Sequence, residues 1–246
     1  NTVTDLESNS SVMNMISGSG FAMEGYPVRS LFSLNFQGLN ESGYPTFINE
    51  KGKLTVSDIN FQEQMRKGHL VYEGPTDPTI TGSFGNVFKY KGFTLNIFIT
   101  YSFGNVIRLD PAFSSRYSDL DAMPREFINR WTTGGDEKYT TVPVIADRRA
   151  NQKDPYLSYA YNAYNYSTER VAKGDFIRMK EISLAYNFPK TVVSKLKISD
   201  LSLKLQATNP FLIYCDKKLN GQDPEFFNTG GVASPIPQQI TFTLKL

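Results

Sequence analysis

Five segments of the chain alternate between apolar and polar residues with a period of two, the pattern of a β-strand with one apolar face. In 93–103, Phe93, Leu95 and Ile97 fall on one face, and Thr94 and Asn96 fall on the other. The five segments are 80–90, 93–103, 175–188, 200–209 and 239–246, and a less regular sixth is 28–37. The pattern predicts an all-β fold in which the five regular segments are antiparallel neighbours in this order.

Two local features refine this prediction. The residues Lys91 and Gly92 between the first two segments favour a tight hairpin turn, because glycine accepts a positive φ. In 175–188 the apolar parity changes between Met179 and Ile182, which predicts a β-bulge at Lys180–Glu181.

The connections between these segments alternate strictly between long and short. They contain about 42 residues (38–79), two (91–92), about 71 (104–174), about 11 (189–199) and about 29 (210–238). Compact soluble domains favour connections of about 4–6 residues. Outer-membrane barrels combine short turns on one side with long loops on the other. We therefore expect the loops 104–174 and 210–238 to project from the same end of the sheet.

Composition excludes several function classes. The chain has 26 Lys and Arg against 24 Asp and Glu, which gives no basic surface for a nucleic-acid partner. The chain has one cysteine, Cys215, so it cannot form an intrachain disulfide. With one histidine, His69, besides this cysteine, it lacks the Cys and His ligands that a structural zinc site usually needs. A Ser–His or Cys–His mechanism would need His69 as its base, and no partner stands near it in the sequence. We expect no enzyme activity, no metal and no cofactor.

Aromatic residues are abundant: 18 Phe, 14 Tyr and 1 Trp. Within the loop 104–174, the candidate residues for contact with substrate or a partner are Tyr156, Tyr159, Tyr161, Tyr164, Tyr166 and Trp131. Aromatic rings stack on apolar surfaces while hydroxyl and amide groups supply hydrogen bonds. Packing of the loop against itself, or an aromatic girdle at a membrane interface, are alternative roles for these tyrosines.

Several stretches, in order along the chain, resemble the C-terminal part of the SusC/RagA family of TonB-dependent outer-membrane transporters. They are EGYPVRSLFSLNFQGLNESGYPTF, TDPTITGSFGNVFKYKGFTLNIFITYSFGN with its paired SFGN blocks, NRWTTGG at 129–135, STERVAKGDFIRMKEISLAYNFPK at 167–190, and LSLKLQATNPFLI. No single motif carries the resemblance. It rests on the ordered set, which covers nearly the whole chain.

The resemblance implies that residues 1–246 are the C-terminal portion of a large transmembrane antiparallel β-barrel. The apolar face, including Leu95, Ile97, Leu203, Leu205, Phe242 and Leu244, would then face lipid. The plug and the remaining strands would lie outside this chain, and TonB would act through that other part. The resemblance also implies the outer membrane of a Gram-negative, Bacteroidetes-like cell, a SusD-like surface lipoprotein as partner, and a glycan or peptide as substrate.

A second hypothesis from another class is a soluble β-sandwich that serves as a carbohydrate-binding module or a glycoside hydrolase. Such a hydrolase needs two carboxyl groups beside the scissile bond. The acidic residues considered for that role are Asp119, Asp121, Asp223 and Glu225. Solvated loop charges are the alternative interpretation of the same residues.

Overall fold

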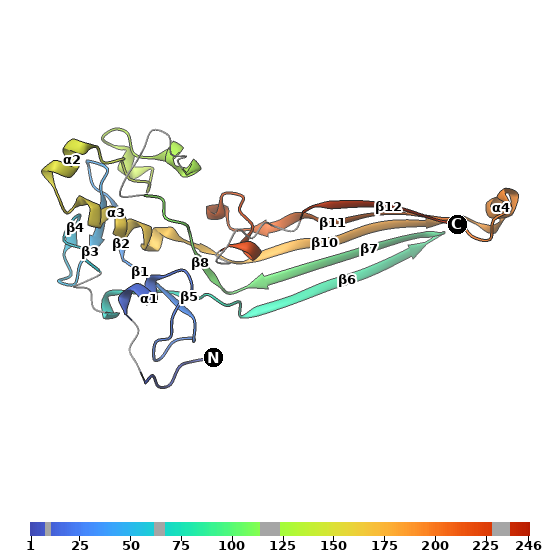
Figure 1. Ribbon diagram of the computed structural model, residues 1–246, viewed down its shortest axis with the longest axis horizontal. Coiled ribbons are helices and arrows are strands. Elements are labelled where there is room, and N and C mark those ends of the chain that lie inside the picture. The colour runs from blue at the N-terminus through green and yellow to red at the C-terminus, as the bar shows by residue number, and fades with distance from the viewer. Residues whose placement is uncertain (8–10, 62–66, 114–123, 228–236) are drawn as a thin grey trace. The chain divides into compact units, whose positions relative to one another are not determined.

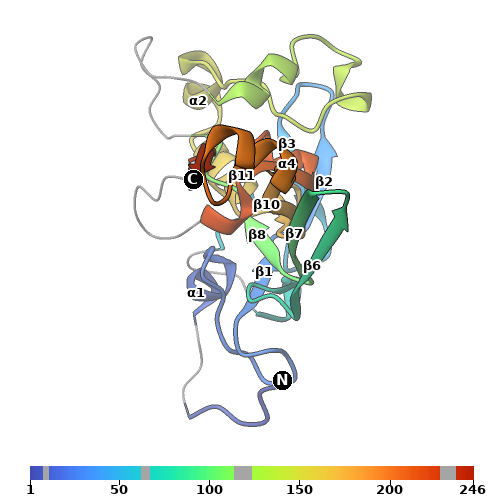
Figure 2. The same cartoon turned by 90° about the vertical axis from the view of Figure 1, so that its right-hand side faces the viewer.

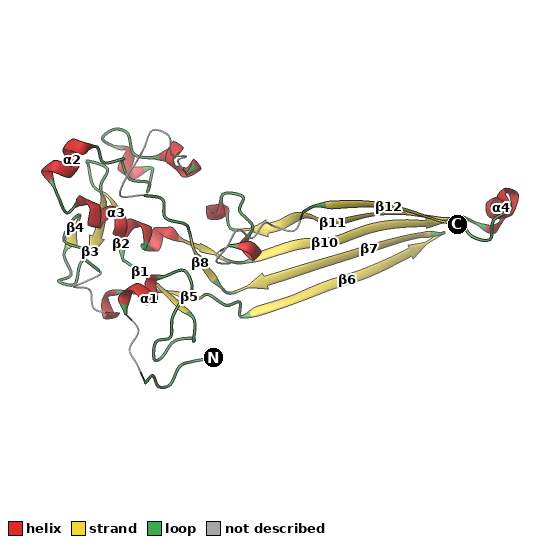
Figure 3. Ribbon diagram, in the orientation of Figure 1, coloured by secondary structure: helices red, strands yellow, loops and turns green. Residues whose placement is uncertain are grey.

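The computed structural model describes residues 1–7, 11–61, 67–113, 124–227 and 237–246 (Figure 1). The chain folds as two units. The unit formed by 1–77 and 106–172 is called the compact unit, and the unit formed by 78–105 and 173–246 is called the sheet unit. Most of the regular structure is antiparallel β-strand, so the all-β prediction is confirmed (Figure 3). Within the described ranges, no helix is both long enough and apolar enough to cross a membrane.

One long antiparallel sheet dominates the sheet unit. Its strands are β6 (Ile80–Tyr90), β7 (Phe93–Phe103), β10 (Phe176–Asn187), β11 (Ser202–Cys215) and β12 (Gln239–Lys245). They lie in the order β12-β11-β10-β7-β6, and β6, β7, β10 and β11 are seen to follow one another in Figure 2. The predicted neighbours and their order are confirmed. The main difference in bounds is that β11 continues to Cys215 rather than ending at position 209.

Short helical turns lie in two connections of the sheet unit. The β10–β11 connection contains α4 (Lys190–Val193) and a 3-10 turn, Ser194–Leu196. The β11–β12 connection contains two 3-10 turns, Lys217–Leu219 and Pro224–Phe226.

Strand β10 has a bulge at Lys180. Met179 pairs with Ile99 of β7 and Glu181 pairs with Phe98, so Lys180 is skipped by the ladder. The register against β11 shifts at the same place. The extra residue returns the apolar side chains on either side of it to one face of the sheet, as a bulge does. The predicted bulge is confirmed.

The turn between β6 and β7 is a two-residue hairpin. Lys91 and Gly92 both have positive φ, 42° and 89°, which is the requirement of a type I′ turn. A Cβ at position 92 would lie 2.8 Å from the carbonyl oxygen of Asn187. Glycine therefore serves both the turn conformation and the close approach of the turn to the end of β10.

The compact unit contains short elements only. Its strands and helices are α1 (Val12–Ile16), β1 (Ser30–Ser33), β2 (Phe36–Leu39), β3 (Pro45–Ile48), β4 (Leu54–Thr55), β5 (Val71–Pro75), β8 (Val106–Arg108), α2 (Arg148–Lys153), α3 (Leu157–Asn165) and β9 (Val171–Lys173), whose last residue belongs to the sheet unit. The 3-10 turns are Lys67–His69, Arg125–Asn129, Asp136–Lys138 and Thr168–Arg170. The small sheets are β1-β5, β2-β3-β4 and β8-β9.

The prediction of one strand over 28–37 is wrong. The segment contains β1, which pairs with β5, and the start of β2, which pairs with β3 in a different sheet. Between them Leu34 leaves both ladders, and its amide donates to the carbonyl oxygen of Tyr166 (3.0 Å). All four residues of β1 are buried, so this strand has no exposed face. Alternation in so short a segment therefore did not indicate a strand of the long sheet.

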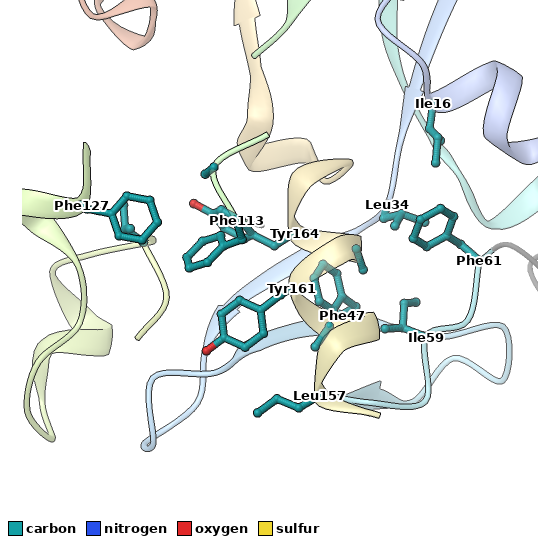
Figure 4. Packing of buried hydrophobic residues seen from close by; sticks show 14 residues of the cluster. Ile16, Leu34, Phe47, Ile59, Phe61, Phe113, Phe127, Leu157, Tyr161 and Tyr164 are labelled. Carbon is teal, nitrogen blue, oxygen red and sulfur yellow. The ribbon is translucent and has the colours of Figure 1, made fainter. Parts of the chain in front are cut away.

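The core of the compact unit is assembled mainly from segments that were expected to be loops (Figure 4). Its buried members are Ile16, Leu34, Phe47, Ile59, Phe61, Ala112, Phe113, Phe127, Val142, Leu157, Ala160, Tyr161, Ala163 and Tyr164. Phe113 contacts the rings of Phe127, Tyr161 and Tyr164 with centroid separations of 4.8–5.4 Å. Fully burying one such side chain contributes on the order of 2–3 kcal/mol. The long connections thus form a folded body with its own core.

Arg108 is buried inside the compact unit and ties three segments together. Its guanidinium donates to the carbonyl oxygens of Ile16 (3.3 Å), Phe32 (2.7 Å) and Ser167 (2.7 Å). Burial lowers the pKa of Arg108 to about 10, and the charge of Glu73 partly opposes this shift. Arg108 therefore remains charged at neutral pH and satisfies carbonyl groups that no water reaches.

Candidate functional site

The long sheet has one apolar face, built by cross-strand rows of side chains. One such row is Phe88, Leu95, Leu184, Leu205 and Phe242, taken from β6 to β12. The next row toward the sheet centre is Asn86, Ile97, Ile182, Ala207 and Ile240. Paired residues of neighbouring strands lie on the same face of a sheet. The apolar residues that alternate in the five separate segments therefore form one continuous surface.

This apolar face is exposed rather than packed into a core. The large side chains on it that are at least 45% exposed are Ile80, Phe84, Phe88, Tyr90, Phe93, Leu184, Leu205, Phe211, Tyr214, Ile240, Phe242 and Leu244. Leu95, Ile97 and Leu203 are half-buried between neighbouring strands. None of these residues belongs to the buried core found among the described residues. An exposed apolar surface of this extent marks contact with a membrane or with another protein surface.

Aromatic residues gather toward both ends of the apolar face. At the hairpin end, the tilted rings of Phe93 and Tyr186 are in contact, with centroids 4.5 Å apart. At the other end, the ring centroids of Tyr101 and Phe103 lie 5.7 Å apart. Tyr214 is on the same face of the sheet. The side chains between the two ends are mainly aliphatic. Phe93 and Tyr101 are separated by roughly 27 Å along the strand.

The opposite face of the sheet is mainly polar. A row across it reads Val87, Asn96, Ser183, Gln206 and Thr241. Asn96 donates to the carboxylate of Glu181 (3.0 Å). The amide and hydroxyl groups of this face can form hydrogen bonds with water or with a polar solute.

The tyrosines predicted to contact substrate or a partner lie on and around helix α3. Tyr161 and Tyr164 are 8% and 1% exposed and form part of the core of the compact unit. Tyr166 is half-buried against Phe61, with ring centroids 5.6 Å apart. Burial therefore takes the rings of Tyr161 and Tyr164 away from the surface, and Tyr166 packs one side of its ring against the protein. The alternative of internal packing, which the sequence left open, describes them.

Tyr156 and Tyr159 differ from the other tyrosines because they are exposed, by 61% and 36%. Their rings are stacked with centroids 5.9 Å apart and an interplanar angle of 24°. Asp154 holds the start of the helix: it accepts a hydrogen bond from the amide of Tyr156 (3.0 Å) and one from the hydroxyl of Ser57 (2.5 Å). The pair is therefore presented by a fixed helix terminus.

The helix itself was missed by the sequence interpretation, which treated 104–174 as loop. The signal was present in the spacing of Leu157, Ala160, Tyr161 and Tyr164, which places four apolar residues on one helical face. The sequence interpretation considered the tyrosines as exposed binding residues and did not consider their helical spacing.

Trp131 belongs to a tightly bonded turn. Its indole nitrogen donates to Glu137 (3.2 Å), and its ring packs so closely on Gly43 that a Cβ at that position would overlap it. Asp136 accepts hydrogen bonds from the amides of Thr132 and Thr133 (3.0 Å each). These bonds lower the pKa of Asp136, and hydrogen bonds within the same turn lower the pKa of Glu137. Both carboxylates stabilise the turn in their ionised form.

The acidic residues considered for glycoside hydrolysis do not form a free pair. Asp223 and Glu225 both contact the guanidinium of Arg178, at 2.5 Å and 3.1 Å. Asp119 and Asp121 lie outside the described residues. Across the described part of the chain, no three His, Cys, Asp or Glu side chains come close enough to hold a metal ion. His69 ends a 3-10 turn, and Cys215 is a free thiol at the end of β11.

Known proteins resemble this chain in sequence and in fold. TonB-dependent receptor P39 of Formosa agariphila is 31% identical over 197 residues, which are 74% of this chain. TonB-dependent receptor P3 of the same organism is 22% identical over 82% of this chain. The structure of the RagAB peptide transporter matches 86% of this chain with a TM-score of 0.58 and 21% identity. The chain is a SusC/RagA-like TonB-dependent receptor sequence.

The SusC/RagA-like chain spans only part of the proteins that it matches. It covers 17% and 19% of the two curated receptors and 21% of the RagAB transporter chain. The RagAB peptide importer in its open-open state gives a similar match, with a TM-score of 0.55, 20% identity and coverage of 83% of this chain and 20% of the importer chain. No protein-family model matches the chain. The named relatives and neighbours are receptors and importers, not enzymes.

Proposed function

We propose that this chain forms part of the wall of an outer-membrane TonB-dependent transporter, with the apolar face of the long sheet in contact with lipid. The observation that carries the proposal is the exposure of that face over five paired strands, opposite a polar face. Outer-membrane barrels alternate in this way, with aromatic residues at both interfaces. A strand tilt of about 40° reduces the separation of the two aromatic ends to about 20 Å across the bilayer, close to the apolar band of such barrels.

In this proposal residues 1–246 are the C-terminal portion of the barrel, and the sheet continues on both sides. Strands β6 and β12 form the two edges of the described sheet. Exposed edges invite pairing with further strands, which the rest of the transporter would supply together with the plug. TonB would act on that other part of the protein.

The long connections lie at one end of the sheet. Phe176, where β10 begins, pairs with Ser102 near the end of β7 and with Cys215 at the end of β11. The connections that follow β7 and β11 therefore leave the sheet at the same end, as expected. We assign this end to the cell exterior, where a SusD-like lipoprotein and the glycan or peptide substrate would approach. The RagAB neighbours are described as peptide importers, which favours a peptide.

The assignment of the two faces is tested by spin labels in the intact transporter, reconstituted in lipid bilayers with Cys215 replaced by Ser. Labels at Leu95 and Ile97 should collide frequently with oxygen, which dissolves in lipid. A label at Asn96, on the opposite face, should collide with a water-soluble nickel reagent instead. Equal accessibility of Asn96 and Ile97 to both reagents would reject a lipid-facing wall.

The stacked pair Tyr156 and Tyr159 is the remaining exposed part of the predicted binding surface, and we propose that it contacts the lipoprotein or the substrate. Aromatic rings of this kind give large contact area at small entropic cost. The double change to alanine should weaken lipoprotein binding or uptake about tenfold, since tenfold corresponds to about 1.4 kcal/mol. Binding is measured with purified transporter in detergent, and uptake in cells.

Tyr139 provides the matched control because it is 90% exposed in the same unit. Tyr139→Ala should leave lipoprotein binding and uptake at their original values. If the Tyr156/Tyr159 double variant behaves like this control, the stacked pair has no role in recognition.

A further inference from the structure

The first part of the β11–β12 connection, residues 216–227, folds against the long sheet around one arginine. Arg178 pairs with Thr100 of β7 and Leu212 of β11, so it belongs to the polar face of the sheet. Its side chain is only 7% exposed. A guanidinium in this position has lost most of its water and requires charged or polar partners from the protein.

Both charged partners of Arg178 come from that single connection. Asp223 lies 2.5 Å from one terminal nitrogen, and Glu225 lies 3.1 Å from the Nε atom. The ring of Phe176 lies 5.5 Å from the guanidinium carbon. Asp223 also accepts the amide of Glu225 (3.1 Å), which closes the 3-10 turn there. The turn is thus shaped to present two carboxylates to one cation.

The start of the same segment is fixed separately. The carboxylate of Asp216 accepts the amide of Lys173 (2.8 Å) and the amide of Lys218 (2.9 Å). Leu219 is 1% exposed. Segment 216–227 is therefore attached to the rest of the sheet unit at two places, one at its beginning and one at Arg178.

We propose that Arg178 is a positioning residue that holds segment 216–227 over the polar face of the wall as a fixed constriction of the transport path. This inference rests on the proposed function, in which the polar face lines the interior of the barrel. Moving the segment away would break both ion pairs of Arg178, which the surrounding protein shields from water, and separating these charges is unfavourable. The segment therefore stays in place while solutes pass, and it limits their size.

The positioning role is tested with a spin label at Gln222, an exposed residue next to Asp223, in the intact transporter with Cys215 replaced by Ser. Arg178→Gln should release the segment and narrow the central line of the spectrum at least twofold. Arg178→Lys, which keeps the charge, should restore much of the immobilisation. Lys204→Gln removes another cation from the polar face, away from the segment, and should leave the spectrum unchanged. An unchanged spectrum in Arg178→Gln would overturn the proposal.

The constriction is tested by uptake of a series of peptides of increasing size. Arg178→Gln should raise the upper size limit, and Lys204→Gln should not. A released label together with an unaltered size limit would overturn the constriction. Failure of the proposed function gives a different result. The labels at Asn96 and Ile97 would not alternate in accessibility, and the unaltered protein would show no uptake, while the spectrum of the Gln222 label would still report on Arg178.

Discussion

Replacing Ile240 by arginine will destabilise the transporter wall, whereas the same change at the neighbouring Thr241 will be tolerated. Ile240 is 78% exposed and lies in the row of Ile97, Ile182 and Ala207, about midway between the two aromatic ends of the apolar face. An arginine on the lipid face at the bilayer midplane costs about 2–4 kcal/mol. Thr241 is on the polar face, where a charged side chain reaches water.

The measurement is unfolding of the intact protein by denaturant in lipid bilayers, supported by the fraction of barrel that inserts into membranes. Both variants replace a β-branched residue of the same strand with arginine. The change in total charge is therefore the same in both, and the change in strand propensity is similar. Equal loss of stability in Ile240→Arg and Thr241→Arg would show that the apolar face does not contact lipid. A larger loss in Thr241→Arg would reverse the assignment of the faces.

Arg108→Met is expected to destabilise the compact unit by about 3–5 kcal/mol. Methionine keeps an unbranched apolar stem but removes the donors to the carbonyl oxygens of Ile16, Phe32 and Ser167. Each buried acceptor left without a partner costs about 1–3 kcal/mol. Hydrogen exchange of amides in α1 and β1 should accelerate, because Ile16 of α1 and Phe32 of β1 both accept hydrogen bonds from Arg108.

Arg148→Met is the control, since Arg148 is exposed on α2, and exchange should remain unchanged in it. Arg108→Lys should give an intermediate loss, because a lysine keeps the charge but lacks the planar, branched set of donors that reaches three carbonyl groups. Equal exchange rates in Arg108→Met and the unaltered protein would show that the three carbonyl oxygens find other donors.

The long sheet could be predicted from the sequence because its determinants are local and periodic. Alternation in 93–103 and 239–246 specifies strands with one apolar face, and the change of parity near Lys180 specifies the bulge. The Lys91–Gly92 turn fixes the hairpin for the same reason: two adjacent residues with positive φ need no tertiary partner. The resemblance to TonB-dependent receptors was also visible in ordered sequence stretches.

The compact unit and the roles of the candidate site residues were decided only by the tertiary structure. Segment 28–37 carries alternation too short to tell one strand from two, and its burial depends on β5 and β3, which lie elsewhere in the chain. Tyr164 and Tyr159 have the same side chain, yet the first fills the core and the second faces outward. Arg178 meets Asp223 across 45 residues of sequence. The sequence identifies the chemical groups of a side chain, but the residues around it come from segments distant in sequence. Those surroundings determine whether the side chain packs in a core, binds a partner or holds another segment in place.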